Sequence, residues 1–208
     1  NLAQRAEEEM QLSLKSIKAA RVSLIKAASD RTDLPIRFID DPEKVALLSE
    51  SAKSLEQFAI AINSLEKKLI IPAEPILKDF AGALNLPVEG VIAREFKEKD
   101  AAGIIRPGII IRTKDNEIVT SPVVATIRYA GPLLDYEMVS ILEPNEGVLL
   151  IFAGLDQVFG KPGQIIPKSS PIGIMGSRIT NTKNFTTVKE LNSGRLSQSL
   201  YIEVRVND

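Results

Sequence analysis

Residues 137–153 read EMVSILEPNEGVLLIFA, and this stretch sets the fold class of the chain. Two short apolar runs, at 137–142 and 148–153, are separated by the sequence PNEG at 144–147. Proline, asparagine and glycine favour tight turns, and short apolar runs bounded by such turns are typical of strands. The stretch therefore predicts two strands joined by a turn.

The same alternation of apolar runs and turns begins near residue 85 and continues to the C-terminus. Further strands are expected at 108–112, 123–129, 171–175 and 199–206. Turns are expected at 114–116 and 160–163, and the polar residues 180–198 are expected to form a loop before the last strand. Many short strands at even spacing predict an antiparallel sheet or barrel.

Before residue 85 the apolar periodicity is helical. Residues 2–28 carry apolar side chains three and four positions apart, interrupted by Arg21, which is the pattern of a coiled-coil seam. A second helix is expected to begin with Asp41 as its N-cap and Pro42 in its first turn, and its apolar positions continue to Ile62. A short helix is expected at 74–83.

Two apolar seams in one chain predict an antiparallel pair of helices that acts as a spacer or as a docking surface for a partner protein. The alternative is a plain helical bundle with only a packing role. The predicted fold class is α+β. A helical hairpin or coiled coil at 1–84, with a regulatory role, is followed by an antiparallel β-rich domain at 85–208.

The composition limits the chemistry that the chain can perform. The 208 residues include no histidine and no cysteine, so disulfides, thiolate metal sites and histidine-based catalysis are excluded. A catalytic zinc site typically uses two or three histidines, and carboxylates alone suit calcium or magnesium better. The formal net charge of −1 gives no field that would recruit nucleic acid.

Several short motifs follow one another in a fixed order between residues 80 and 205. They are FAGALNLPVEG at 80–90, GIII at 108–111, YAGP at 129–132, FAGL at 152–155, GQ at 163–164, PIGIMG at 171–176 and SLYIEVR at 199–205. In order and spacing they resemble the LytM, or lysostaphin-type, metallopeptidase fold. The resemblance is to its degenerate branch, the murein hydrolase activator EnvC family, in the alphaproteobacterial form.

Active members of this fold hold zinc with a histidine, an aspartate four residues later and the second histidine of a His-x-His pair. By resemblance these ligands fall at Arg106, Ile110 and Tyr201, the first histidine of the pair at Ser199, and a further histidine at Gly154. The resemblance therefore implies a protein that is not an enzyme and holds no metal or cofactor.

A site that has lost its metal ligands can persist as a groove that binds a partner. The resemblance implies a groove lined by Arg106, Ile110, Tyr136, Gly154, Ser199, Tyr201, Glu203 and Arg205. Aromatic and arginine side chains are frequent in binding hot spots. The alternative is that Tyr201 and Arg205 only complete a strand, with Arg205 paired to Glu203 or Glu137.

A Tyr within a Gly-Tyr-Gly turn of the family corresponds to Tyr136, but here the flanking residues are Asp135 and Glu137. The expected geometry of this turn is therefore open.

By resemblance, the chain activates a zinc-dependent peptidoglycan (N-acetylmuramoyl-L-alanine) amidase in septal cell-wall splitting and daughter-cell separation. The coiled coil is expected to dock on an FtsEX-type membrane division complex, and residues 64–83 are a candidate cover for the groove. A periplasmic location is expected, with the signal peptide absent from a fragment that begins at Asn1. The alternatives are a non-catalytic peptidoglycan-binding or scaffolding module, and an enzyme that binds a metal through carboxylates.

Overall fold

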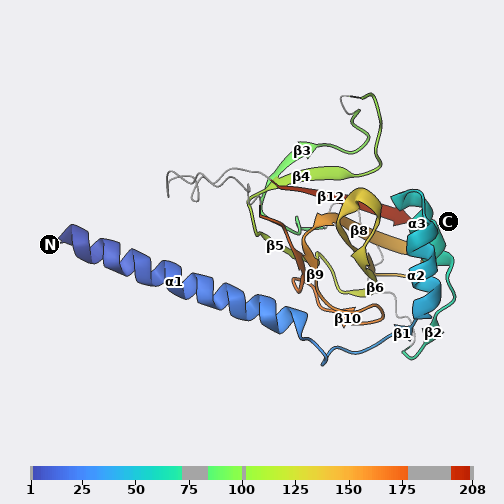
Figure 1. Cartoon of the computed structure of the whole chain (residues 1–208), viewed down its shortest axis with the longest axis horizontal. Coiled ribbons are helices and arrows are strands. Elements are labelled where there is room, and N and C mark those ends of the chain that lie inside the picture. The colour runs from blue at the N-terminus through green and yellow to red at the C-terminus, as the bar shows by residue number, and fades with distance from the viewer. Residues whose placement is uncertain (1, 72–83, 100–101, 178–197, 207–208) are drawn as a thin grey trace.

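The structure is a computed structural model that describes residues 2–71, 84–99, 102–177 and 198–206 (Figure 1). Three α-helices precede a β-rich region whose paired strands are antiparallel, which confirms the α+β class. The helices are α1 (Leu2–Ser29), α2 (Pro42–Ser51) and α3 (Leu55–Ser64), with a short 3-10 turn, η1 (Leu134–Tyr136). The described helices include none with the length and apolar character needed to cross a bilayer.

Twelve strands form three sheets in the described chain. They are β1 (Phe38–Ile39), β2 (Lys68–Leu69), β3 (Val91–Arg94), β4 (Ile109–Thr113), β5 (Ile118–Thr120), β6 (Ala125–Pro132), β7 (Met138–Glu143), β8 (Val148–Leu155), β9 (Gln157–Val158), β10 (Ile165–Ile166), β11 (Pro171–Ile174) and β12 (Gln198–Val206). The large sheet has the order β10-β6-β7-β8-β12-β4-β3, the small sheet has the order β5-β11-β9, and β1 pairs with β2.

All six strands expected from the sequence are present, within about three residues at each end. The hairpin β7–β8 forms as expected, and Gly147 supplies a positive φ of 79° in its turn. The expected helix 74–83, most of the loop 180–198 and the first residues of the 80–90 motif lie outside the described residues.

The large sheet buries apolar side chains on both faces. One face packs toward the small sheet, with Ile111, Ile127, Phe152 and Leu200 in a shared core. The other face packs against α3, because strand side chains alternate between faces. This second face also carries the groove described below.

The expectation of one continuous helix from Asp41 to Ile62 is wrong, because the chain breaks into α2 and α3. Ala52 is extended (φ −64°, ψ 136°), and the Ser54 side chain accepts a hydrogen bond from Gln57 N at 3.1 Å as the N-cap of α3. Because α3 begins as a separate helix after Ser54, its apolar side chains can face the large sheet. The expected N-cap of α2 is confirmed, since the Asp41 side chain accepts from Glu43 N at 3.1 Å.

The helix α1 extends away from α2 and α3, so the described helices do not form the expected antiparallel pair (Figure 1). The linker after α1 runs along the β region, with Ile36 bridged to Gln164. The C-terminal end of α1 packs there, since Ala28 lies in a core cluster with Phe159. Further toward the N-terminus, apolar side chains such as Ile17 are exposed (61%).

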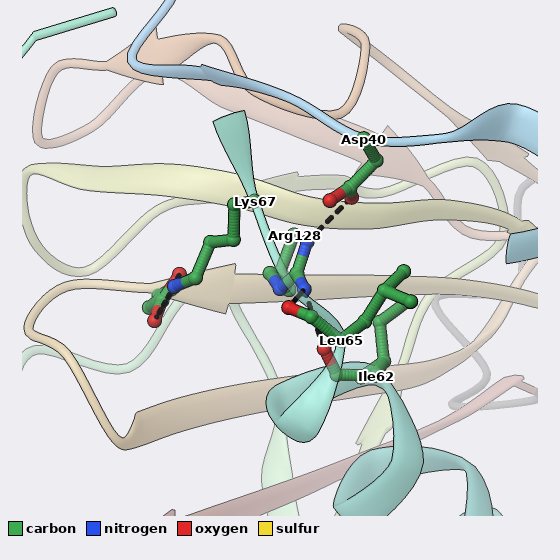
Figure 2. A network of polar contacts seen from close by, with 6 residues as sticks. Asp40, Ile62, Leu65, Lys67 and Arg128 are labelled. Carbon is green, nitrogen blue, oxygen red and sulfur yellow. Dashed lines mark hydrogen bonds and ion pairs between the residues drawn. The ribbon is translucent and has the colours of Figure 1, made fainter. Parts of the chain in front are cut away.

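A buried polar network fixes α3 and β1 to the large sheet (Figure 2). Arg128 of β6 is fully buried and forms an ion pair with Asp40. It also donates to the Ile62 and Leu65 carbonyls, at 2.5 and 3.1 Å, at the C-terminal end of α3. These carbonyls lack partners within the helix, so the guanidinium completes the helix end.

Lys67 provides a second attachment of the same segment, through its ion pair with Glu143 of β7 at 2.5 Å. Although α2 and α3 precede residue 85, α3 belongs to the core of the β-rich region.

Candidate functional site

The floor of the candidate site is formed by three neighbouring strands of the large sheet. Tyr201 of β12 stands opposite Ile110 of β4 on one side and opposite Ala153 of β8 on the other. Paired residues point to the same face, so their side chains form one surface. Ser199 lies two residues before Tyr201 on the same face.

A groove of about 270 Å³ lies over this floor. Six of the eight residues expected from the sequence line it: Arg106, Ile110, Tyr136, Gly154, Ser199 and Tyr201. The remaining lining residues are Arg94, Asp135, Glu137 and Ala153. Arg106 reaches toward the opposite wall, where its Nη1 donates to the Tyr136 hydroxyl at 3.4 Å.

Glu203 and Arg205 do not line the groove but support it from the next positions of β12. The Tyr201 hydroxyl donates to Glu203 Oε2 at 2.7 Å, and Arg205 forms an ion pair with the other oxygen of Glu203. Arg205 also lies 3.5 Å from Glu56 of α3. The expected pairing of Arg205 with Glu203 is therefore present alongside the groove.

The surroundings of Tyr201 keep it neutral and fixed. Burial, followed by the hydrogen bond to Glu203, raises the pKa of the Tyr201 hydroxyl. Burial also raises the pKa of Glu203, against the lowering effects of Tyr201 and Arg205. A methyl group on Gly108 would lie 2.6 Å from Cζ of Tyr201, so the absence of a side chain there makes room for the ring.

Gly154 occupies a position that cannot readily carry a side chain. Its φ is +88°, and an added Cβ would lie 2.6 Å from the Ser199 carbonyl oxygen. The register between β7 and β8 shifts beside it, which is the mark of a bulge. A histidine at this position would require the backbone to move.

The turn that carries Tyr136 includes two non-glycine residues with positive φ. Glu137 has φ 59° and ψ −133°, and Leu134 also has a positive φ of 50°. Such conformations cost non-glycine residues roughly 1–3 kcal/mol. A turn is present at Tyr136, and its backbone strain lies at Glu137 and Leu134.

The groove and α3 share one face of the large sheet. Along β8, Leu149 and Ile151 lie in the core cluster with α3, whereas Ala153 contributes to the groove floor. The described part of the candidate cover, residues 64–71, includes β2, which pairs with β1. The rest of that candidate lies outside the described residues.

Across the described chain, no group of three or more acidic side chains is placed to hold a metal ion. The groove floor presents a phenol, a hydroxyl and aliphatic groups, and its rim presents two arginines and two carboxylates. This arrangement offers shape, aromatic surface and charge for binding. Arg94 gave no sequence signal, because β3 has four residues and no clear alternation.

The raised pKa of Glu203 predicts a pH-dependent stability. The folded state holds the Glu203 proton more tightly than the unfolded state, so the free energy of unfolding should fall as pH rises above about 4.5 and level off above the folded pKa. Glu203→Gln should remove this component of the slope. Urea unfolding of both proteins between pH 4 and 8 measures it, and parallel profiles would contradict the assignment.

The fold and the groove define a mostly antiparallel α+β domain with a groove on one sheet face. No family model matches the chain. The uncharacterized protein NMB1333 of Neisseria meningitidis serogroup B is 31% identical over 96 residues, which are 46% of this chain and 16% of that protein. This chain therefore spans about a sixth of the length of the curated relative that it matches.

Several solved structures are similar to this chain. Csd3 of Helicobacter pylori covers 60% of this chain at 20% identity and a TM-score of 0.44, with 32% of its own chain matched. Lysostaphin covers 62% at 15% identity and a TM-score of 0.44, with 49% of its own chain matched. A zinc-containing peptidase of Vibrio cholerae covers 67% at 19% identity and a TM-score of 0.40, with 39% matched.

Proposed function

We propose that this protein is a non-catalytic activator of a zinc-dependent cell-wall amidase, acting in septal peptidoglycan splitting. The observation that carries the proposal is the lining of the groove. The positions that the family resemblance assigns to metal ligands are Arg106, Ile110 and Tyr201, and they lie around one groove with Gly154 and Ser199. Their side chains suit recognition of a protein surface rather than hydrolysis.

Several contacts prepare the groove for binding. Tyr201 is held by Glu203 through its hydroxyl and packs on Gly108 through its ring. A side chain that is already ordered loses less conformational entropy when a partner binds. Tyrosine therefore offers a large contact area here at a low entropic cost.

Activation requires only that the groove bind the open conformation of the amidase more tightly than the closed one. A difference of about 1–3 kcal/mol gives roughly 5- to 150-fold activation. In this proposal the amidase supplies the metal and the chemistry, and this chain supplies the differential binding.

The proposal extends to the helix α1 and to location. The apolar side chains of α1 are exposed along most of its length, including Met10, Leu14 and Ile17. Such a stripe is suited to pairing with another helix, and we propose that it docks on an FtsEX-type membrane complex. The site of action would then be the periplasm.

The binding step is tested by titration calorimetry of this protein with purified zinc-dependent amidases. The proposal predicts one-to-one binding in the micromolar range or tighter by at least one of them. A full panel without measurable binding would contradict it. The peptidoglycan-binding alternative predicts instead that the protein sediments with purified sacculi in the absence of any amidase.

A further inference from the structure

The two walls of the groove carry opposite charges. On one side of the floor, the turn that contains η1 places the exposed Asp135 and Glu137 at the rim. On the other side, Arg94 ends β3 and Arg106 precedes β4. In the order of the large sheet, these walls flank the floor strands β8, β12 and β4.

The acidic wall is not neutralised by the protein itself. Among the described residues, the side chains of Asp135 and Glu137 form no hydrogen bond or ion pair, in contrast to Asp40, Glu143 and Glu203, which are all paired. The contact of the Arg106 side chain is to the neutral Tyr136 hydroxyl rather than to these carboxylates. The carboxylates of Asp135 and Glu137 and the positive charge of Arg106 therefore remain available to a bound molecule.

We infer that the groove binds a polypeptide segment of mixed charge, with a lysine or arginine facing Asp135 and Glu137 and an aspartate or glutamate facing Arg106. This inference rests on the proposed function and adds the chemistry of the partner at the same groove. A segment with this polarity can lie in the groove in one direction only, because the reversed segment would place like charges together.

The two parts of the groove should affect different rate constants. Exposed rim charges act mainly on the association rate and on its salt dependence. Contacts on the floor, such as those of Tyr201, act mainly on the dissociation rate. Neutralising a wall should therefore change the association rate constant and leave dissociation nearly unaltered.

The test measures association of a purified amidase by surface plasmon resonance at low and high salt. The variants are Asp135→Asn with Glu137→Gln for the acidic wall, and Arg106→Gln for the basic wall. Glu7→Gln with Glu8→Gln on α1 is the control for the acidic-wall variant, since it also removes two carboxylates, at residues that do not line the groove. We expect each wall variant to associate about fivefold or more slowly at low salt, with a weaker salt dependence, and the control to match the unmodified protein.

The acidic-wall variant removes negative charge and the basic-wall variant removes positive charge, so the pair distinguishes steering by net charge from binding by a groove of mixed polarity. Steering by net charge alone would make the acidic-wall and basic-wall variants deviate in opposite directions, whereas a groove of mixed polarity makes both slower. An acidic-wall variant that associates as fast as the unmodified protein, or faster, overturns the inference while the proposed function stands. If the unmodified protein binds none of the amidases, that result contradicts the proposed function itself.

The strain at Glu137 supplies a further control. Glu137→Gly removes the charge and suits the positive φ of this residue, so it should not lower stability. We expect it to slow association as Glu137→Gln does. Unchanged association by both variants would show that the Glu137 carboxylate does not contact the partner.

Discussion

The double variant Tyr201→Ala with Arg205→Ala is expected to lose amidase activation while remaining folded. Tyr201 provides the aromatic surface of the groove floor, and Arg205 holds Glu203, which in turn orients the Tyr201 hydroxyl. Truncating a hot-spot residue costs about 2 kcal/mol or more. The two changes together should therefore weaken amidase binding about 100-fold or more.

Val204→Ala is the matched control for this double variant. Val204 lies on the same strand but its side chain points to the opposite face, where it is half exposed (45%). The control should activate normally. Circular dichroism and thermal unfolding establish that both variants are folded, and normal activation by a folded double variant would remove Tyr201 and Arg205 from the binding site.

Asp40→Ala is expected to produce a large loss of stability. Its carboxylate is the ionic partner of Arg128, which is fully buried. Removing one partner of a buried pair typically costs about 3–5 kcal/mol, because the other charge stays in the interior. Since Arg128 also closes the end of α3, that helix should loosen from the sheet first.

Urea unfolding measures this loss, with Asp33→Ala as the control. Asp33 pairs with Arg31 at the surface, its side chain is 72% exposed, and such pairs contribute at most about 1 kcal/mol. Replacing both buried partners, as in Arg128→Met with Asp40→Leu, should recover much of the stability. A cost below about 1 kcal/mol for Asp40→Ala would show that Arg128 is satisfied without this carboxylate.

The strands of the large sheet could be predicted because their sequence signals are local. In residues 137–153, the turn residues and the apolar runs determine the hairpin without help from the rest of the chain. The apolar periodicity does not predict the break between α2 and α3, because the spacing continues across it. The start of α3 is marked instead by the N-cap spacing of Ser54 and Gln57, where Gln57 N donates to the Ser54 side chain.

The same distinction applies to the groove. Tyr201, Ser199 and Ile110 could be placed together from sequence motifs, because the pairing of β12 with β4 brings them side by side. The pairing of Arg205 with Glu203 could also be expected from the sequence, because both lie on β12. The further contact of Arg205 with Glu56 depends on the position of α3, which the sequence did not reveal. The oppositely charged walls come from β3 and the η1 turn, which are far apart in the sequence. Their placement on either side of the groove is determined by the strand order of the folded sheet.

Release of dye from labelled peptidoglycan sacculi shows whether the groove activates a separate enzyme. Zinc-dependent amidases are assayed alone and with this protein, and this protein is assayed alone. We expect no release by this protein alone and roughly 5- to 150-fold faster release when it is added to its amidase. Release by this protein alone, or no acceleration of any amidase that it binds, would rule out a non-catalytic activator.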